Sequence, residues 1–282
     1  MHNLQPLQPI DYLVIGHITC DITPTGPRLG GTATYSALTA KALGLKAGIV
    51  TSWGSELSLG PLRDIPIVSY PTEQSTTFEN KYMGHERRQT VSYIAPNLDY
   101  FLVPEPWRNA PIVHLGPVVQ EVEPSLVRHF PSSLLGLTPQ GWLRSWDQQG
   151  IVHPSEWPEA TFMLQQAGAA VISIEDVGGD EQRIEEMASA ARILAVTEGI
   201  TGARVYWNGD VRRYNAPDVE EVDPTGAGDI FATAFFFRLY HTRDPWEAAR
   251  FATQIASRSV TRQGHESVPT QDEIYECLVE VL

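Results

Sequence analysis

Lysine is scarce in this sequence of 282 residues, in which only Lys41, Lys46 and Lys81 occur. Arginine therefore carries most of the positive charge, and acidic residues outnumber basic ones by 34 to 20. The formal net charge of −14 and a pI near 4.9 argue against nucleic acid and anionic membranes as partners. No apolar run approaches the length of a membrane span, so we expect no membrane-spanning helix.

Cysteine is rare as well. The two cysteines, Cys20 and Cys277, lie far apart in the sequence, and we recognise no signal peptide. This usage predicts reduced thiols and a cytoplasmic protein. The eight histidines include no HExxH pair and no Cys/His metal spacing, which argues against a zinc site.

Apolar residues, in contrast, make up 42% of the chain, which is enough to bury one large core. Strand-like runs alternate with helical segments, which predicts one α/β domain over residues 1–282 with a mainly parallel sheet covered on both faces. The expected strands are 12–16, 48–51, 112–115, 133–137, 170–173, 192–196 and 203–207. The expected helices are 32–43, 123–129, 156–167, 180–189, 226–240, 245–261 and 270–281.

Residues 66–95 break this alternation. The stretches 67–70, 76–82 and 88–94 alternate polar and apolar side chains with period two, and polar turns separate them. Such a pattern is typical of antiparallel strands that are exposed on one face. The segment therefore predicts a small antiparallel sheet beside the core.

The segment 223–229, DPTGAGD, has the composition of an anion-binding loop at the start of a helix. Thr225 can cap the helix, and Gly226 and Gly228 let the backbone come close to a ligand. The first-turn amides would be unpaired donors at the positive end of the helix dipole. Asp229 would repel an anion there, unless its task is to take a proton from a hydroxyl that attacks a phosphate. An ordinary glycine-rich helix start is the simpler explanation of a bare GxGD tetrapeptide, so the longer string has to decide.

A second glycine-rich segment follows the first expected strand. Asp21 comes a few residues after that strand, and residues 29–37 (LGGTATYSA) lead into a helix that ends near Gly44. The paired glycines Gly30 and Gly31 would let a polyol approach the backbone. Taken alone, the pattern fits an ordinary strand–loop–helix equally well.

Both segments resemble signatures of the ribokinase-like (PfkB) carbohydrate kinases. DPTGAGD resembles the C-terminal signature, and LGGTATYSA resembles the first one, GGxxxNxA. Residues 192–199 (RILAVTEG) resemble the family's strand and V-T-x-G nucleotide loop, and residues 202–207 resemble the strand that follows. The resemblance implies a three-layer αβα sandwich with a mainly parallel central sheet. It also implies a small antiparallel β lid over the substrate, formed by residues 66–95 and the 21–31 loop.

The resemblance further implies roles for single residues. Asp229 would be the catalytic base, and the amides of Gly226, Ala227 and Gly228 would bind the phosphoryl oxygens. The substrate-binding positions would be Asp21, Gly30, Gly31, Tyr35, Asn80 and Arg144. The nucleotide-binding positions would be Thr197, Glu198, Gly199, Gly202 and Gly228. The implied cofactors are ATP and Mg²⁺, with Asp176 at the magnesium, and a monovalent cation such as K⁺ at Asp223, Thr225 and Gly264.

Two substrate-side positions depart from the family pattern. Tyr35 stands where most sugar kinases have Asn, which puts a ribose- or fructose-type contact in doubt. Thr138 stands where the motif D-x-Q-G-x-x-R would begin, although Gln140 and Arg144 are kept. Arg144 could therefore reach substrate or phosphate, or be a solvated arginine at a helix end. The tryptophans around this motif are interpreted first as apolar packing.

Two further departures concern the phosphate side. Ser173 and Asp176 keep the spacing of the family's N-x-x-E motif, which helps to hold magnesium-bound phosphates, but with other residue types. Magnesium tolerates this exchange because it wants hard oxygen ligands and keeps several waters. A plain acidic loop at a strand end is the open alternative. Thr233, one turn after Asp229, stands where the family usually has a smaller residue.

These observations predict ATP-dependent phosphorylation of a hydroxyl on a small sugar or cyclitol. Tyr35, the TFEN stretch (77–80) and the QGxxR stretch (140–144) favour an inositol-like acceptor. A nucleoside kinase of the same fold is the competing enzyme, and a large apolar sub-site for a base would distinguish it. A non-catalytic sugar or nucleotide binder is the alternative from another class, which the degraded N-x-x-E motif favours and Asp229 opposes. Because lids of this family often carry a dimer contact, a homodimer through the lid is also expected.

Overall fold

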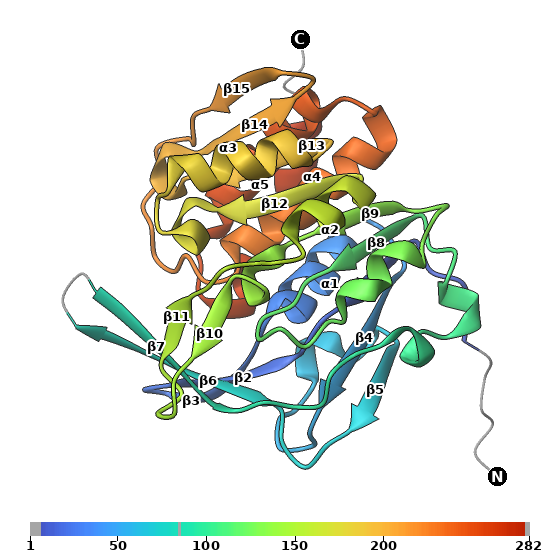
Figure 1. Ribbon diagram of the computed structural model, residues 1–282, viewed down its shortest axis with the longest axis vertical. Coiled ribbons are helices and arrows are strands. Elements are labelled where there is room, and N and C mark those ends of the chain that lie inside the picture. The colour runs from blue at the N-terminus through green and yellow to red at the C-terminus, as the bar shows by residue number, and fades with distance from the viewer. Residues whose placement is uncertain (1–6, 84–85, 280–282) are drawn as a thin grey trace.

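The protein is a layered α/β structure, shown in Figure 1 as a computed structural model that describes residues 7–83 and 86–279. The helices are α1 Thr32–Ala42, α2 Ala160–Gln166, α3 Glu181–Ala190, α4 Ala227–Thr242, α5 Pro245–Ser259 and α6 Gln271–Val279. Residues 280 and 281 of the last expected helix lie outside the described residues. The expected helix at 123–129 is instead a 3₁₀-helix, Pro124–Arg128, which begins with a proline. No helix within the described ranges is long and apolar enough to cross a membrane.

The main sheet has nine strands in the order β15-β14-β13-β12-β9-β8-β1-β4-β5. Their bounds are β1 Tyr12–Ile15, β4 Ala47–Trp53, β5 Ile67–Pro71, β8 Ile112–Leu115, β9 Leu134–Leu137, β12 Ala169–Ser173, β13 Ile193–Thr197, β14 Ala203–Trp207 and β15 Asp210–Tyr214. Neighbours from β5 to β13 are parallel, whereas β14 and β15 are antiparallel to their neighbours. The expected mainly parallel sheet is confirmed, and every strand predicted for it is present.

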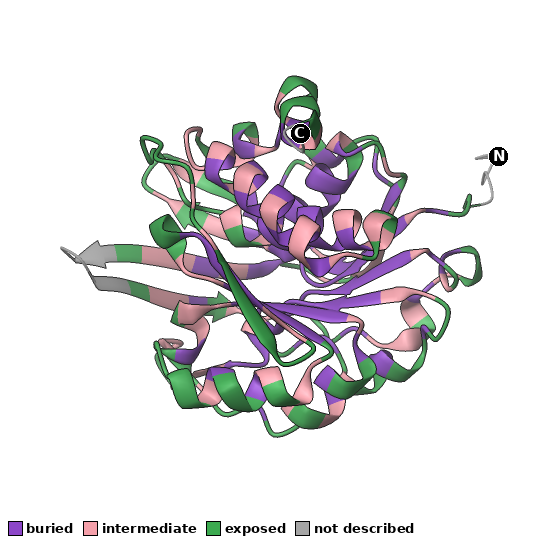
Figure 2. Cartoon of the chain, turned by 90° about the horizontal axis from the view of Figure 1, so that it is seen from above, coloured by how far each residue is buried: buried purple, intermediate pink, exposed green. Residues whose placement is uncertain are grey.

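Each parallel strand sends alternate side chains into two separate cores, as the strand period of two requires. On β1, Tyr12 and Val14 pack on the face covered by α1, α4, α5 and α6. Leu13 and Ile15 pack on the opposite face, which α2 and α3 cover. Figure 2 shows the buried strands between these two helical layers. Both faces being covered explains why the strands read as continuous apolar runs.

A smaller four-stranded sheet crosses one end of the main sheet, in the order β3-β2-β6-β7 (Figure 1). Its strands are β2 Thr19–Thr23, β3 Gly26–Gly30, β6 Thr76–Met83 and β7 Glu86–Tyr93. The outer pairs are antiparallel, whereas β2 and β6 run parallel. The 21–31 loop is therefore largely a strand pair. Residues 84 and 85 of the expected lid lie outside the described residues.

One part of the expected lid was assigned to the wrong sheet. Residues 67–70 belong to β5, which pairs in parallel with β4 at the edge of the main sheet. An edge strand that packs on one face shows the same period of two as a lid strand, so the pattern alone does not distinguish them. The smaller sheet, which is the expected lid, therefore consists of β2, β3, β6 and β7 without residues 67–70.

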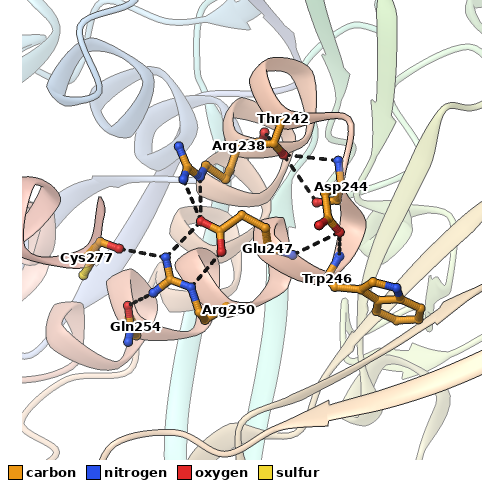
Figure 3. Close-up of polar contacts among 8 residues, drawn as sticks. All are labelled: Arg238, Thr242, Asp244, Trp246, Glu247, Arg250, Gln254 and Cys277. Atoms are coloured by element: carbon orange, nitrogen blue, oxygen red, sulfur yellow. Dashed lines mark hydrogen bonds and ion pairs between the residues drawn. The ribbon is translucent and has the colours of Figure 1, made fainter. Parts of the chain in front are cut away.

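Helices α4, α5 and α6 are tied together by a carboxylate that accepts from two arginines (Figure 3). Glu247 on α5 accepts hydrogen bonds of 2.7 Å from Arg238 on α4 and 2.8 Å from Arg250. Arg250 also donates to the carbonyl of Cys277 on α6. Burial by itself raises the pKa of Glu247, but the hydrogen bonds from Arg250 and Arg238 outweigh it and hold the pKa below its usual range.

We expect Glu247→Gln to lower the free energy of unfolding by about 1–3 kcal/mol, because two partly buried arginines lose their counter-charge. Urea denaturation at pH 7 measures this loss. The lowered pKa stabilises the fold above the unfolded value and ceases to do so as pH falls, so the difference between the proteins should shrink in acid. Asp64→Asn is the control, since the Lys41–Asp64 pair is exposed. A loss no larger than that of the control would contradict the prediction.

Candidate active site

A cavity of about 980 Å³ lies between the carboxyl ends of the parallel strands and the smaller sheet. Strand ends contribute Ser173 and Thr197, and the smaller sheet contributes Asp21, Phe78 and Asn80. Open α/β sheets commonly bind ligands at this edge. Of the residues selected from the sequence, those that line the cavity are Asp21, Gly31, Tyr35, Asn80, Arg144, Asp176, Thr197, Gly199, Gly202, Thr225, Gly226, Ala227, Gly228 and Asp229. The cavity lining does not include Gly30, Glu198, Asp223 or Gly264.

The DPTGAGD segment starts α4 at the floor of the cavity. Gly226 is the N-cap and has a φ of 82°, in the left-handed region that favours glycine. A Cβ at this position would lie 2.4 Å from Cδ1 of Tyr35, so the turn rests directly on that ring. A Cβ at Gly228 would meet no protein atom within 4 Å, so this position faces open space. A ligand can therefore come close to the backbone at Gly228.

The amides of this turn are only partly free. Ala227 donates its amide hydrogen to the carbonyl of Pro224 at 3.1 Å, so one of the three expected phosphoryl donors is engaged. At Gly228, one residue further into α4, the amide belongs to the first turn, where helix amides have no partner four residues back. The expected anion site would therefore be centred on Gly228 and the amide that follows it.

Asp229 is half-buried in the first turn of α4. Burial raises the pKa of its carboxyl to about 6, while a hydrogen bond from the Thr32 side chain and the charge of Arg144 act to lower it. The nearby carboxylates of Asp176 and Asp21 raise it further. A carboxylate with a raised pKa is a better proton acceptor than an ordinary aspartate, which titrates near 3.9.

We expect the acceptor kcat/KM to fall as pH drops below about 6, because Asp229 then becomes protonated. The loss should approach about tenfold per pH unit, and a pH–rate series between 5 and 8 measures it. Burial also raises the pKa of Asp176, so a second carboxyl of the cavity could contribute to the pH dependence. Residual activity of Asp229→Asn identifies the group, because it should lack this acid limb. An unchanged limb in that variant would assign the titration to another residue.

Asp21 lies in β2 and accepts a 2.8 Å hydrogen bond from the hydroxyl of Thr19. A Cβ at Gly30 would lie 2.1 Å from a carboxylate oxygen of Asp21, so Gly30 makes room for this carboxylate. Gly31, at a φ of 83°, approaches the carbonyl of His17 and also lines the cavity. The paired glycines therefore position Asp21 and the backbone beside it.

Tyr35 is a buried residue of α1, although it borders the cavity. Its ring supports Gly226 on one side and lies 5.6 Å from the ring of His265, centroid to centroid. Burial and the carboxylates of Asp21, Asp223 and Asp229 raise its pKa. The structure thus gives Tyr35 a supporting contact to the anion-binding turn, and the expected contact to substrate stays a prediction.

The wall beside Asp21, whose register partner on β6 is Phe78, is part amide and part apolar. Gln89 donates to the side-chain oxygen of Asn80 at 3.1 Å across β6 and β7. Phe78, Val118, Leu143 and Val152 add an apolar surface to the same cavity. Arg144 lies at the start of β10 Arg144–Trp146, which pairs with β11 Val152–Pro154. Arg144 lines the cavity, donates to the carbonyl of Val118 at 3.4 Å, and carries a charge that acts to lower the pKa of both Asp229 and Asp176, so it lies near both carboxylates.

The other end of the cavity is built from segments that the sequence interpretation did not select. Beyond Thr197, Gly199 and Gly202 it is lined by residues 216–219 and by one face of α5 and its C-cap, namely Thr253, Ala256, Ser257 and the C-cap Val260. They are three, one and three residues apart, which places their mostly small side chains on one helix face. This spacing is the sequence signal that could have identified them. Glu198 is not among the lining residues, and its carboxylate pairs with Arg204 and Arg213.

The two cation predictions differ in how the residues are placed. Asp176 accepts from the amide of Ser173 at 2.9 Å and from Gln140 at 3.3 Å, and it lines the cavity together with Glu175. Among residues 7–83 and 86–279, no three histidines, cysteines or carboxylates gather to hold a metal ion. One or two carboxylates suit Mg²⁺ that is held mainly by phosphates and water.

The residues expected at a monovalent cation do lie together. The carboxylate of Asp223 accepts from the amides of Thr225, at 3.0 Å, and Gly264, at 3.1 Å. It thereby ties the anion-binding loop to the 3₁₀-helix Gly264–Ser267. The cation itself stays a prediction.

Known proteins resemble this chain in sequence and in fold. Residues 151–271 match the pfkB family of carbohydrate kinases. A cytidine kinase from Thermococcus kodakarensis is 26% identical over 281 residues, which cover 92% of this chain and 99% of the relative. Ribokinase from Bacillus subtilis is 38% identical over 95 residues, which cover 33% of this chain and 32% of the relative.

Solved structures share the fold. A pyrophosphate-dependent kinase of the ribokinase family, solved with a pyrophosphate analogue and myo-inositol, has a TM-score of 0.77 at 20% identity, covering 91% of this chain and 98% of its own. A sugar kinase from Pyrococcus horikoshii, solved with ATP, has a TM-score of 0.73 at 18% identity, covering 94% and 97%. Together with the pfkB match, these findings show that the chain has the ribokinase-like fold and carries a pfkB family carbohydrate kinase domain over residues 151–271; such kinases are phosphotransferases with an alcohol group as acceptor.

Proposed function

We propose that this protein transfers the γ-phosphoryl group of ATP to a hydroxyl of a small sugar or cyclitol. The observation that carries the proposal is the pairing of Asp229 with the open turn at Gly228. A carboxylate whose pKa is raised to about 6 lies one residue after a backbone position that faces open cavity. An anion site with a proton acceptor at its edge suits an attack of a hydroxyl on a phosphate.

The mechanism follows from what these residues can do. Asp229 orients the acceptor hydroxyl and takes its proton as the bond to phosphorus forms. The first-turn amides at Gly228 and Asp229 donate to the phosphoryl oxygens, and the loose transition state makes such positioning the main source of rate. Arg144, whose charge acts on both Asp229 and Asp176, offsets the negative charge that collects there. Asp21 holds the other hydroxyls of the acceptor.

Magnesium fits the phosphate side of this arrangement. Glu175 and Asp176 would hold it, directly or through water, and it would neutralise charge on the phosphates of ATP. Gln140 and the amide of Ser173 keep the Asp176 carboxylate turned towards the cavity. The nucleoside of ATP would bind at the end of the cavity that the α5 face and residues 216–219 line. The small side chains of α5 leave room for it there.

A nucleoside is the second candidate acceptor, and one observation favours it. The apolar wall of Phe78, Val118, Leu143 and Val152 lies beside the Asn80–Gln89 amide pair. A flat base could pack on such a wall and use the amides for its polar edge. A relative that matches along 92% of this chain is a cytidine kinase, which supports the same acceptor.

A phosphotransfer screen tests both candidates. The purified protein is incubated with Mg²⁺, with ATP or pyrophosphate as donor, and with ribose, fructose, myo-inositol or cytidine as acceptor. We expect ATP to be the donor and one acceptor to exceed the others by at least about tenfold in kcat/KM. Asp229→Asn is the control for contaminating kinases. No turnover with any pair would favour a binding protein and overturn the proposed function.

The remaining predictions about assembly and ions have their own measurements. Light scattering after size-exclusion chromatography tests the homodimer through the smaller sheet. Activity in K⁺ compared with Na⁺ or a bulky organic cation tests the monovalent site at Asp223, Thr225 and Gly264.

A further inference from the structure

A chain of buried polar side chains runs through the apolar core from the cavity to the backbone of Asp229. Tyr12 on β1 places its hydroxyl 3.3 Å from the hydroxyl of Thr233 on α4 and 2.8 Å from Nδ1 of His114 on β8. Nε2 of His114 lies 2.8 Å from the hydroxyl of Thr138, which borders the cavity. Tyr12, His114 and Thr233 are fully buried. Thr233 then donates at 2.9 Å to the carbonyl of Asp229.

The direction of these hydrogen bonds can be worked out from one end. Because Thr233 gives its hydrogen to Asp229, its oxygen has to accept from Tyr12. The Tyr12 oxygen then accepts from Nδ1 of His114, and Nε2 of His114 accepts from Thr138. Burial lowers the pKa of His114 to about 3, so the ring is neutral and carries its single hydrogen on Nδ1.

The other side of Asp229 is held as well. Its carboxylate accepts from the Thr32 side chain at the start of α1. A Cβ at Gly116 would lie 2.4 Å from Cγ2 of Thr32 and 3.2 Å from the hydroxyl of Thr138. Thr32 and Thr138 therefore both pack against this one glycine. Asp229 is thus held at its carboxylate, through Thr32, and at its carbonyl, through the chain that ends at Thr138. Both threonines pack against Gly116.

A threonine that bonds the carbonyl four residues earlier is common in helices and needs no further role. What is unusual is the continuation through Tyr12 and His114, whose polar atoms lie in an apolar core. The His114 ring is 5.1 Å from that of Phe236, and Tyr12 belongs to the same core cluster. Polar groups buried in this way are costly unless all are satisfied, and here each one is.

We propose that Thr233, Tyr12, His114 and Thr138 are positioning residues, which hold the first turn of α4 so that Asp229 points at the acceptor hydroxyl. Thr233 therefore has a reason to be larger than the residue that the family uses at this position. None of the four has to touch the reacting atoms. Thr138 lines the cavity, but its proposed role is to position the others. The proposal goes beyond the proposed function but rests on it, because its kinetic consequence requires phosphotransfer.

The kinetic test uses Thr233→Val, which keeps the shape and removes the hydroxyl. We expect kcat to fall by about 3–10-fold, the effect of one hydrogen bond, with both KM values within about twofold of wild type. Thr233→Ser keeps the hydroxyl and should restore at least half of the wild-type kcat. In an Asp229→Asn background, Thr233→Val should change kcat by less than about twofold, because the chain acts through that carboxylate.

Thr39→Val is the matched control. Thr39 is a fully buried helical threonine on α1, and its hydroxyl has no partner within the described residues. Its change should leave kcat within about twofold. The proposal is overturned if Thr39→Val lowers kcat as much as Thr233→Val does. It is equally overturned if the serine variant is no better than the valine variant, or if Thr233→Val has its full effect in the Asp229→Asn background.

A second measurement needs no activity. In protein labelled with ¹⁵N-histidine, the NMR chemical shifts of the two imidazole nitrogens show which nitrogen carries the hydrogen. We expect the Nδ1–H form for His114 in the wild type and the Nε2–H form in Thr233→Val, where Tyr12 can turn its hydroxyl hydrogen to His114. An Nε2–H ring in the wild type would overturn the one-way chain. If the wild type shows no turnover at all, the proposed function fails, and this spectrum still decides the hydrogen-bond chain.

Discussion

Replacing Asp229 with asparagine should lower kcat by about 10²-fold or more, because the change is nearly isosteric and removes the proton acceptor. Nucleotide affinity should stay close to wild type, since the first-turn amides and the α5 face do not depend on this charge. Steady-state kinetics with the preferred acceptor, together with an ATP titration, measure both quantities. Near-wild-type turnover would remove Asp229 from the role of base.

The same variant should be more stable than the wild type at neutral pH. Burial raises the pKa of Asp229 to about 6, so between about pH 4 and pH 6 the folded protein holds a proton that the unfolded chain has lost. Stability therefore falls as pH rises through that window, and the asparagine variant escapes this loss. We expect a higher Tm for Asp229→Asn at pH 8 and a smaller gain near pH 4. Asp64→Asn, at an exposed ion pair, should show neither effect.

Truncating Asp21 to alanine should raise the acceptor KM by about 10- to 100-fold. A carboxylate can accept two hydroxyl hydrogen bonds, and losing charge-assisted bonds costs about 1.5–3 kcal/mol. Gly30 leaves room for this carboxylate, and the Thr19 hydroxyl orients it. The KM for ATP should hardly move, because the α5 face and residues 216–219 line the far end of the cavity.

Asp21→Asn separates this role from a structural one. It keeps the size of the side chain and can still accept from Thr19, so we expect a smaller rise in acceptor KM with an unchanged Tm. The competing explanation is that Asp21 only stabilises β2. Equal losses for both substrates, or a lower Tm with the acceptor KM unchanged, would support that explanation.

Local patterns were sufficient for the core of the fold and for the glycine-rich turns. The central strands of the main sheet, β1, β4, β8, β9, β12 and β13, are largely continuous apolar runs because both faces are covered, and such runs are visible in a sequence. Gly226 and Gly31 both adopt positive φ. The glycine-rich sequence of their segments was the signal for this conformation. Where one pattern serves two purposes the sequence is not sufficient, and residues 67–70 were assigned to the wrong sheet for this reason.

Contacts between distant segments could not be predicted. The motif placed Tyr35 at the substrate, where it lines the cavity, but no local pattern indicated that its ring also supports Gly226. Glu198 has the right place in a nucleotide loop, but arginines that arrive from β14 and β15 engage it. The buried chain from Thr138 to Asp229 joins β1, β8 and α4, and no local pattern marks it.

The support of the anion-binding turn by Tyr35 also has a consequence for the synthesis of the protein. The turn at Gly226 rests on an α1 side chain, and His265 bonds the carbonyl of Leu29 at 2.9 Å. Both contacts join the first part of the chain to the last, so a nascent chain on the ribosome has no complete site until residue 265 has emerged. Contacts of such long sequence separation form late and slowly. An incomplete chain should therefore be unable to act on ATP, which would protect the cell from a half-made kinase.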